Sequence, residues 1–411
     1  MKPYPLKPGR GTYPAERIVG REREITQLLR LLITQSVSVE ELRRMGKTLL
    51  VKKLEYICNR NLVPEEFKQE GFKVKYLSFE GIQTLGGLID TLIREFEKIK
   101  DWSKIDWART YEFIRKIIKS QKVKIAEAEF SINLPEYKRT WQEAFFKVLE
   151  DIADAQETNG SKLILIFDEL PLMLWEWHKK GNAGEGIELL DILRKKRQEL
   201  EEKGLRFVYC GSIGMNIILK TYKKLYGYAG PATNDMEPFS VDPFTEEDAF
   251  FLCDCFEAGG FKTSNKEQCY PLIYQLSNGL PFYISQMFNI IQIDFDKEVN
   301  EETVKSAYRI ILNNPDYHND FNQLKDRINI YYPENEAKVM LYILNFLSQK
   351  ETIINQEEIL SGLAIEDRII KDQLYQMTKD HLLSRTQSES GTWQYQFKHE
   401  IFRQWWQINQ A

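Results

Sequence analysis

The chain has 411 residues, of which 43% are hydrophobic, and its formal net charge is −5. This length predicts two or three domains with packed cores, and the acidic balance excludes a chain-wide basic surface that would by itself imply nucleic acid as a partner. We find no signal peptide and no apolar run near the ~20 residues of a membrane span, so we expect a cytoplasmic protein without a membrane partner. Five cysteines without paired C-x-x-C spacing predict reduced, buried thiols.

Up to about residue 240, apolar strands alternate with amphipathic helices. A turn glycine, Gly20, precedes a helix that runs to Leu32. The strands are predicted at residues 36–39, 73–79, 163–167 and 206–210, and further helices at 49–58 and 85–99. Strands separated by helices predict a parallel sheet whose ligands bind at the carboxyl ends of the strands.

The first strand leads into a phosphate-binding sequence. Gly46 lets backbone N–H groups approach phosphate oxygens, the Lys47 ammonium reaches the β- and γ-phosphates, and the Thr48 hydroxyl is a Mg²⁺ ligand. The helix that follows directs its positive end at the anion. The candidate nucleotide-binding residues of this segment are Arg43, Arg44, Met45, Gly46, Lys47, Thr48 and Leu49.

One position departs from the full pattern G-x-x-x-x-G-K-[ST], which has a glycine where this chain has Glu41. A carboxylate at that position either repels phosphate or points to solvent, and the sequence leaves both outcomes open. Arg43 and Arg44 are expected to compensate for its charge. The departure puts nucleotide affinity and turnover in question.

Two carboxylates follow the buried strand at 163–167. In a P-loop NTPase the first holds Mg²⁺ and the second orients or deprotonates the attacking water. Asp168 and Glu169 are therefore the candidate catalytic residues, with Thr48 and Asp168 as metal ligands. The alternative is a helix N-terminus with acidic residues in its first turn. Ser212, beyond the next strand, either senses the γ-phosphate or belongs to a Gly-Ser turn.

Two clusters of basic residues interrupt this pattern. The first contains Arg115, Lys116, Lys119, Lys122 and Lys124. Such a cluster either meets nucleic acid or another protomer, or forms a solvated face. The second, Arg194-Lys195-Lys196-Arg197, is quickly balanced by glutamates and predicts a solvated helix.

Beyond residue 240 the pattern becomes helix upon helix. Thr245 caps a helix start, and Gly279-Leu280-Pro281 closes one helix and opens the next, which predicts a compact helical domain. Helices at 337–347, 356–363 and 367–382, followed by an alternating hairpin, describe a winged helix. Three bases and four acids give its third helix a charge of 3 − 4 = −1 over residues 366–380, which favours protein packing over DNA recognition.

Several motifs together resemble one family. Residues 18–25 (Ile-Val-Gly-Arg-Glu-Arg-Glu-Ile), 42–48, 166–169 and 210–215 resemble the archaeal-ATPase-like members of the STAND and AAA+ P-loop NTPases. The resemblance covers nearly the whole chain. It implies an α/β fold with a P-loop NTPase parallel sheet at residues 1–240, a helical lid domain at 241–330 and a C-terminal winged-helix domain at 331–411.

The resemblance also implies further contacts with nucleotide. The region beside the adenine corresponds to Val19, Gly20 and Arg21. Pro281 corresponds to the lid proline that packs on the base, and His399 to a histidine that touches the β-phosphate of ADP in related signalling ATPases. A lone histidine at a helix start is also a common structural residue.

The function implied is an ATP-binding molecular switch, with ATP or ADP and Mg²⁺ as cofactors and slow hydrolysis. Nucleotide would clamp the core against the lid and winged helix, and its exchange or hydrolysis would free a surface for a partner protein or self-assembly, in regulation or defence. No arginine finger can be assigned, because 225–228 (Leu-Tyr-Gly-Tyr) lacks the arginine of relatives. Two alternatives stay open: a DNA-binding ATPase of the initiator or transposition-regulator kind, and a non-hydrolysing scaffold with a degenerate P-loop.

Overall fold

The computed structural model describes residues 2–9, 13–96 and 160–410, together with residues 146, 149–151, 153 and 154. The chain divides into two compact units. The core unit comprises Glu22–Glu40 and Lys47–Ser240, and the C-terminal unit comprises Met1–Arg21, Glu41–Gly46 and Val241–Ala411. The basic cluster predicted at residues 115–124 lies outside the described residues.

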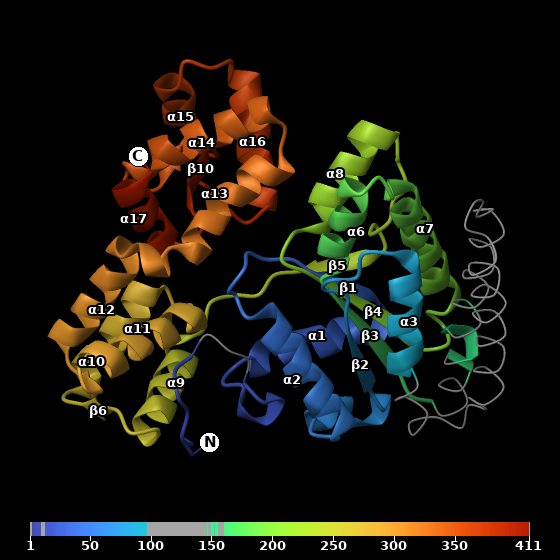
Figure 1. Cartoon of the computed structure of the whole chain (residues 1–411), viewed down its shortest axis with the longest axis horizontal. Helices are drawn as coiled ribbons and strands as arrows, with labels where there is room; N and C mark the ends of the chain where they lie inside the picture. The colour runs from blue at the N-terminus through green and yellow to red at the C-terminus, as the bar shows by residue number, and fades with distance from the viewer. Residues whose placement is uncertain are drawn as a thin grey trace, which may run out of the picture. The chain divides into compact units, whose positions relative to one another are not determined.

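A five-stranded parallel sheet forms the centre of the core unit, with strand order β2-β3-β4-β1-β5 (Figure 1). Its strands are β1 (Ser36–Val39), β2 (Lys73–Ser78), β3 (Leu163–Asp168), β4 (Leu205–Cys210) and β5 (Met236–Phe239). Every residue of β1, β3 and β4 is buried, as parallel strands covered on both faces require. The first four strands lie where the sequence predicts them. The short edge strand β5 was not predicted because Pro238 interrupts its pattern.

Helices precede and connect the strands of this sheet. Those within the described ranges are α1 (Glu22–Thr34), which leads into β1, and α2 (Lys47–Asn59), α3 (Leu85–Phe96), α6 (Leu170–Lys179), α7 (Ala183–Glu199), α8 (Met215–Tyr226) and the 3-10 helix η2 (Glu65–Glu70). The step from β1 to β2 crosses the sheet in the opposite direction to the step from β3 to β4. Right-handed crossovers therefore place α2 on one face and α6 and α7 on the other, as Figure 1 shows.

The second basic cluster is not the solvated face that the sequence predicts. Lys196 and Arg197 of α7 are only 5% and 2% exposed. Arg197 donates hydrogen bonds to Asp235 over 2.9 and 2.5 Å and to the Tyr209 hydroxyl over 3.0 Å. A cationic side chain is tolerated there because these partners replace water. The prediction holds for the exposed Lys195 but is wrong for Lys196 and Arg197, because charge balance along the sequence does not reveal which partners fold onto α7.

The C-terminal unit begins with a helical part. Its elements are η1 (Ala15–Arg17), α9 (Glu246–Ala258), β6 (Lys262–Thr263), α10 (Lys266–Ser277), α11 (Pro281–Asp294), β7 (Glu298–Val299), α12 (Glu301–Asn313), η4 (Pro315–Tyr317) and α13 (Asn319–Tyr331). The Thr245 side chain caps α9 by accepting a hydrogen bond from the Asp248 backbone, as predicted. A capping box of Asn300 and Thr303 opens α12.

The last part of the C-terminal unit is a winged helix, as predicted. Its elements are α14 (Glu334–Ser348), β8 (Ile354–Asn355), α15 (Gln356–Gly362), α16 (Asp367–Lys379), β9 (Leu383–Gln387) and β10 (Trp393–Phe397). The hairpin of β9 and β10 gains β8 as a third antiparallel strand beside β10. A final helix, α17 (Glu400–Asn409), packs against α12 and α14. The winged helix is therefore joined to the helical part within one unit.

The cysteines agree with the sequence-based expectation. All five are buried and none forms a disulfide. Burial raises the pKa of the Cys58 thiol to about 12, which makes it unreactive at neutral pH. Among the helices of the described ranges, none is both long and apolar enough to cross a bilayer.

Candidate nucleotide-binding site

The carboxyl ends of four parallel strands lie in one row, because their registers align the last residues of β1, β2, β3 and β4. Asp168 ends β3, and Ser212 follows the end of the neighbouring β4. Thr48 lies in the first turn of α2, and its hydroxyl donates a hydrogen bond to Asp168 Oδ2 over 3.1 Å. The core unit thus brings the P-loop threonine to the acidic strand tip.

Asp168 uses its two carboxylate oxygens differently. Oδ2 accepts hydrogen bonds from the Tyr76 hydroxyl over 2.7 Å and from Thr48. Oδ1 is buried and has no hydrogen-bond partner in the part of the chain that the structure describes. The whole residue is 3% exposed. A buried carboxylate oxygen without a donor is costly unless a ligand completes it.

The residues around Asp168 fit a magnesium ion that is bound together with phosphate. Mg²⁺ prefers oxygen ligands and takes one or two from carboxylates or hydroxyls, with waters and substrate phosphates supplying the rest. Thr48 and Asp168 offer this kind of donor. No group of three or more His, Cys, Asp and Glu side chains suited to a metal ion occurs within the described ranges. A site of this type would depend on nucleotide to complete its ligands.

Glu169 lies directly after Asp168 in the left-handed backbone region, with φ of 61°. This conformation is uncommon for a residue other than glycine and clusters at functional sites. Its Oε2 atom accepts hydrogen bonds from the Ser212 N–H over 2.9 Å and the Ser212 hydroxyl over 2.8 Å. Burial raises the pKa of Glu169, which the Ser212 hydrogen bonds and the Lys47 charge oppose. Glu169 is therefore held by Ser212 and feels the charge of Lys47, and its catalytic role stays a prediction.

The first part of the P-loop, Glu41–Gly46, belongs to the C-terminal unit, although Lys47 follows it directly in the core unit. Arg43 donates to Gln323 of α13 over 2.7 Å. Arg44 forms an ion pair with Asp320 of the same helix over 2.6 Å. The two arginines proposed to balance Glu41 and bind nucleotide are therefore held by α13 side chains.

Glu41 neither points to solvent nor lacks a countercharge. Its side chain is fully buried, and Oε2 pairs with the Lys398 ammonium and lies 3.4 Å from His381 Nδ1. Its Oε1 accepts a hydrogen bond from the Leu42 N–H over 2.9 Å. The solvent-facing alternative is therefore wrong, because a buried carboxylate requires the cations and donors that the winged helix provides.

Arg21 is a buried connector within the C-terminal unit. Its guanidinium donates to the carbonyl oxygens of Asp242 over 2.6 Å and Met45 over 2.7 Å, and it lies 4.7 Å from the Phe244 ring centre. Gly20 precedes it with φ of +66°, and a Cβ there would meet the Asp248 carboxyl at 2.9 Å. The predicted adenine-contacting segment Val19, Gly20 and Arg21 is thus fixed next to Met45 of the P-loop.

Pro281 is the first residue of α11, and His399 precedes α17. Burial, together with the charges of Lys398 and His381, lowers the pKa of His399 to about 3, so its ring is neutral at physiological pH. His399 Nε2 is buried and has no hydrogen-bond partner among the described residues. The predicted contact of this histidine with phosphate stays a prediction.

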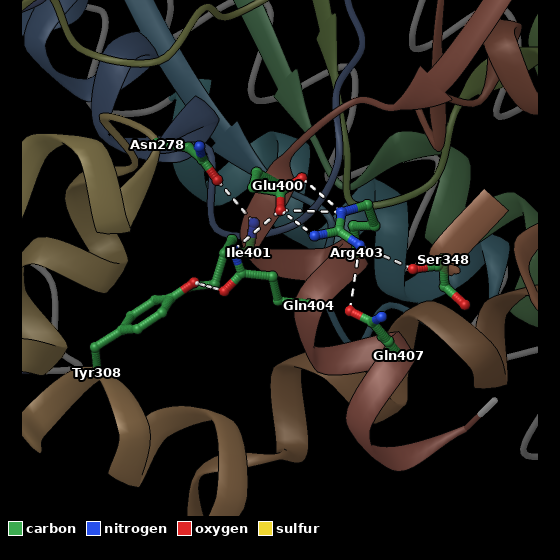
Figure 2. Close-up of polar contacts among 8 residues, drawn as sticks. All are labelled: Asn278, Tyr308, Ser348, Glu400, Ile401, Arg403, Gln404 and Gln407. Carbon is green, nitrogen blue, oxygen red and sulfur yellow. Dashed lines mark hydrogen bonds and ion pairs between the residues drawn. The ribbon is translucent and has the colours of Figure 1, made fainter. Parts of the chain in front are cut away.

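Figure 2 shows the polar contacts that fix the start of α17. Asn278, just before Pro281, accepts a hydrogen bond from the Ile401 N–H over 2.8 Å. Tyr308 of α12 donates to Gln404 over 2.8 Å. Arg403 joins Glu400 and the Ser348 carbonyl of α14. The turn at Asn278 is therefore linked through α17 to α14 of the winged helix.

Sequence reasoning missed two residues that complete these arrangements, Tyr76 and His381. Tyrosine is common in strands, so nothing in the sequence marked Tyr76 as a partner of Asp168. His381 follows α16 with φ of +60°. A positive φ at a non-glycine residue is visible only in the folded backbone.

The parallel sheet, the helical part and the winged helix define a P-loop NTPase fold with a helical part and a winged helix in its C-terminal unit. No family model matches the chain, and no curated protein does. ORC2 from Aeropyrum pernix, solved in ADPNP–ADP complexes, is similar with 12% identity and a TM-score of 0.44, over 97% of each chain. Hsp104 from S. cerevisiae, in a casein complex, shares 14% identity with a TM-score of 0.40, over 88% of this chain and 50% of that one. PCH-2 from C. elegans shares 8% identity with a TM-score of 0.33, over 70% and 66%. Likeness at this level says nothing about function.

Proposed function

We propose that this chain is an AAA+-type molecular switch that binds ATP or ADP with Mg²⁺ and hydrolyses ATP slowly. The observation that carries the proposal is the strand tip, where Asp168 binds Thr48 through one oxygen and keeps its other oxygen buried with no donor from the described residues. Such an oxygen is costly in a purely structural carboxylate. It is the arrangement expected where a nucleotide-bound cation completes the ligands.

Each residue has a role that follows from its chemistry. Lys47 neutralises phosphate charge, and Thr48 and Asp168 would hold a magnesium ion, which would supply charge stabilisation on the transferring phosphoryl group. Glu169 orients and accepts a proton from the attacking water, and Ser212 holds the glutamate carboxylate through its N–H and hydroxyl. Burial raises the pKa of Glu169, which makes its carboxylate a stronger proton acceptor.

The coupling between nucleotide and domain arrangement is proposed to run along the P-loop itself. Glu41, Arg43 and Arg44 are bonded to side chains of the winged helix and α13, and the same segment continues into Lys47. Phosphate binding that changes the backbone of this loop would change those bonds. A nucleotide that prefers one loop arrangement thereby shifts the population of the C-terminal contacts, which control a partner protein or self-assembly.

The pairing of Glu41 also bears on the scaffold alternative. In that alternative Glu41 has cost the loop its nucleotide, and the Lys398 pair removes charge repulsion as the reason for such a loss. The DNA-binding alternative stays a prediction, because its basic cluster at 115–124 lies outside the described residues. Binding of duplex DNA that falls steeply with added salt would favour it.

Isothermal titration calorimetry with ATP and ADP, combined with a phosphate-release assay, tests the proposal. Lys47→Ala is expected to abolish binding, and Glu169→Gln to retain binding but stop hydrolysis. Lys195→Ala, which changes an exposed lysine of α7, is the matched control and should behave as the wild type. Nucleotide binding that survives Lys47→Ala, or turnover unchanged in both site variants, would refute the site assignment.

A further inference from the structure

Tyr76 of β2 reaches the metal-binding carboxylate from the neighbouring strand. Its hydroxyl donates to Asp168 Oδ2 over 2.7 Å, although the two residues are 92 positions apart in the chain. The register pairs Ser78 with Asp168, so Tyr76 is the diagonal neighbour two residues earlier in β2. Diagonal neighbours in a sheet lie within reach of a long aromatic side chain. The contact therefore follows from the sheet register rather than from a mobile loop.

The Tyr76 side chain is itself held in place. Its backbone N–H donates to Glu55 of α2 over 2.9 Å, and the Lys52 ammonium of the same helix lies 5.2 Å from its ring centre. A tyrosine has few rotatable bonds, so a packed ring delivers its hydroxyl to one point at low entropic cost. The helix that carries Thr48 thus also fixes Tyr76.

Two hydrogen-bond donors occupy Oδ2 of Asp168 and leave Oδ1 for a ligand. Tyr76 and Thr48 both donate to this oxygen, while Oδ1 keeps its lone pairs without a protein donor in the described part of the chain. When Thr48 gives its proton to Asp168, its own oxygen lone pairs also remain free for a cation. A carboxylate held at one oxygen cannot rotate to give both oxygens to Thr48.

We propose that Tyr76 is a positioning residue that holds Asp168 with Oδ1 available to a magnesium ion bound with nucleotide. This inference rests on the proposed nucleotide-binding function. Hydrogen-bond partners of metal-binding side chains typically contribute 10–100-fold to metal affinity. The hydroxyl of Tyr76, not its ring, is the group that acts.

The test is Tyr76→Phe, which removes one hydroxyl and keeps the packed ring. Binding of a fluorescent ADP analogue is measured in EDTA and across a Mg²⁺ titration. We expect the apparent Mg²⁺ affinity to fall by about 10- to 100-fold, with nucleotide affinity in EDTA unchanged. Tyr222→Phe is the matched control, because Tyr222 is also buried in the core unit and donates to a backbone carbonyl, that of Leu174, over 3.0 Å. It should leave the Mg²⁺ dependence unchanged.

Three results would overturn the assignment. In the first, the Mg²⁺ titration of Tyr76→Phe coincides with that of the wild type. In the second, the nucleotide affinity of Tyr76→Phe falls as far in EDTA as in Mg²⁺, which indicates a merely structural role. Wild-type protein that binds no nucleotide at any Mg²⁺ concentration would instead overturn the proposed function, and the role of Tyr76 with it. Thermal melting of both variants shows whether each is folded.

Discussion

Glu41 and Asp168 are two buried carboxylates of similar exposure, 4% and 3%, but they differ in how many of their oxygens have partners. Both oxygens of Glu41 are matched, one by the Leu42 N–H and the other by Lys398 and His381. Asp168 has two donors on one oxygen and none among the described residues on the other. Burial alone therefore does not identify a carboxylate as part of a functional site. The number of hydrogen-bond donors on each of its two oxygens is the more informative feature.

The physical reason lies in the cost of burying charge. A carboxylate removed from water is stabilised only by counterions and hydrogen bonds of good geometry. Glu41 obtains these from the protein and is a structural element of the C-terminal unit. Asp168 obtains hydrogen bonds from the described residues at Oδ2 only, and its free Oδ1 is where a ligand would bind. Three substitutions test this difference between a carboxylate matched by the protein and one that awaits a ligand.

The largest effect is expected for Asp168→Asn, which removes the metal-binding charge but keeps the side-chain shape. ATP turnover should fall by roughly 1,000-fold, corresponding to about 4 kcal/mol, because charge stabilisation by the bound cation is lost. Phosphate release at saturating Mg²⁺ measures it. Asp191→Asn is the control, since Asp191 also accepts a tyrosine hydroxyl, that of Tyr228, over 2.7 Å. If Asp168→Asn retained the wild-type turnover, Asp168 would not be a metal-binding residue.

A third carboxylate, Asp235, calibrates what a matched ion pair contributes to stability. Arg197→Met leaves Asp235 without its cation and removes the donor to the buried Tyr209 hydroxyl and the Ala232 carbonyl, so the free energy of unfolding in urea at pH 7 should fall by about 3 kcal/mol. Burial opposes ionisation of Asp235, but the hydrogen bond and charge of Arg197 outweigh it and hold the pKa of that carboxyl below its usual value.

The sign of the pH dependence follows from that lowered pKa. The stabilisation is complete above the unfolded pKa of about 3.9 and is lost as the pH falls through the lower folded value. The difference in unfolding free energy between wild type and Arg197→Met should therefore shrink below about pH 3.9. A difference that stays constant down to the acid limit would show that packing, not charge, holds Arg197.

The smallest effect is expected for Glu41→Gln, which keeps the Leu42 hydrogen bond but removes the charge opposite Lys398. Because the Lys398 side chain is 22% exposed and can partly rehydrate, we expect a loss of about 1–2 kcal/mol in unfolding free energy. Calorimetric melting measures it. Lys305→Ala, which breaks a surface pair with Glu301, should cost less than about 0.5 kcal/mol. A Glu41→Gln protein as stable as the wild type would mean that the pair is not structural.

Local patterns made much of the architecture predictable. The strands β1, β2, β3 and β4 are continuous apolar runs, and the helices of the winged helix have clear apolar periodicity. The P-loop glycine, lysine and threonine are adjacent in sequence, so their roles could be inferred from local spacing. The burial of Arg197 was not predicted because its partner Asp235 lies in the turn before β5, 38 residues away.

Local sequence patterns were enough to predict the α/β alternation and the winged helix, and to name Thr48 and Asp168 as candidate metal ligands. Only the tertiary structure decided that Tyr76 completes Asp168 and that Lys398 neutralises Glu41, because these partners are 92 and 357 residues apart. Hydrogen bonds and ion pairs act over a few ångströms in space, whereas sequence patterns report on neighbours within a helix turn or a strand. Local sequence patterns can therefore predict that a residue is buried, but its hydrogen-bond and ion-pair partners depend on the tertiary structure.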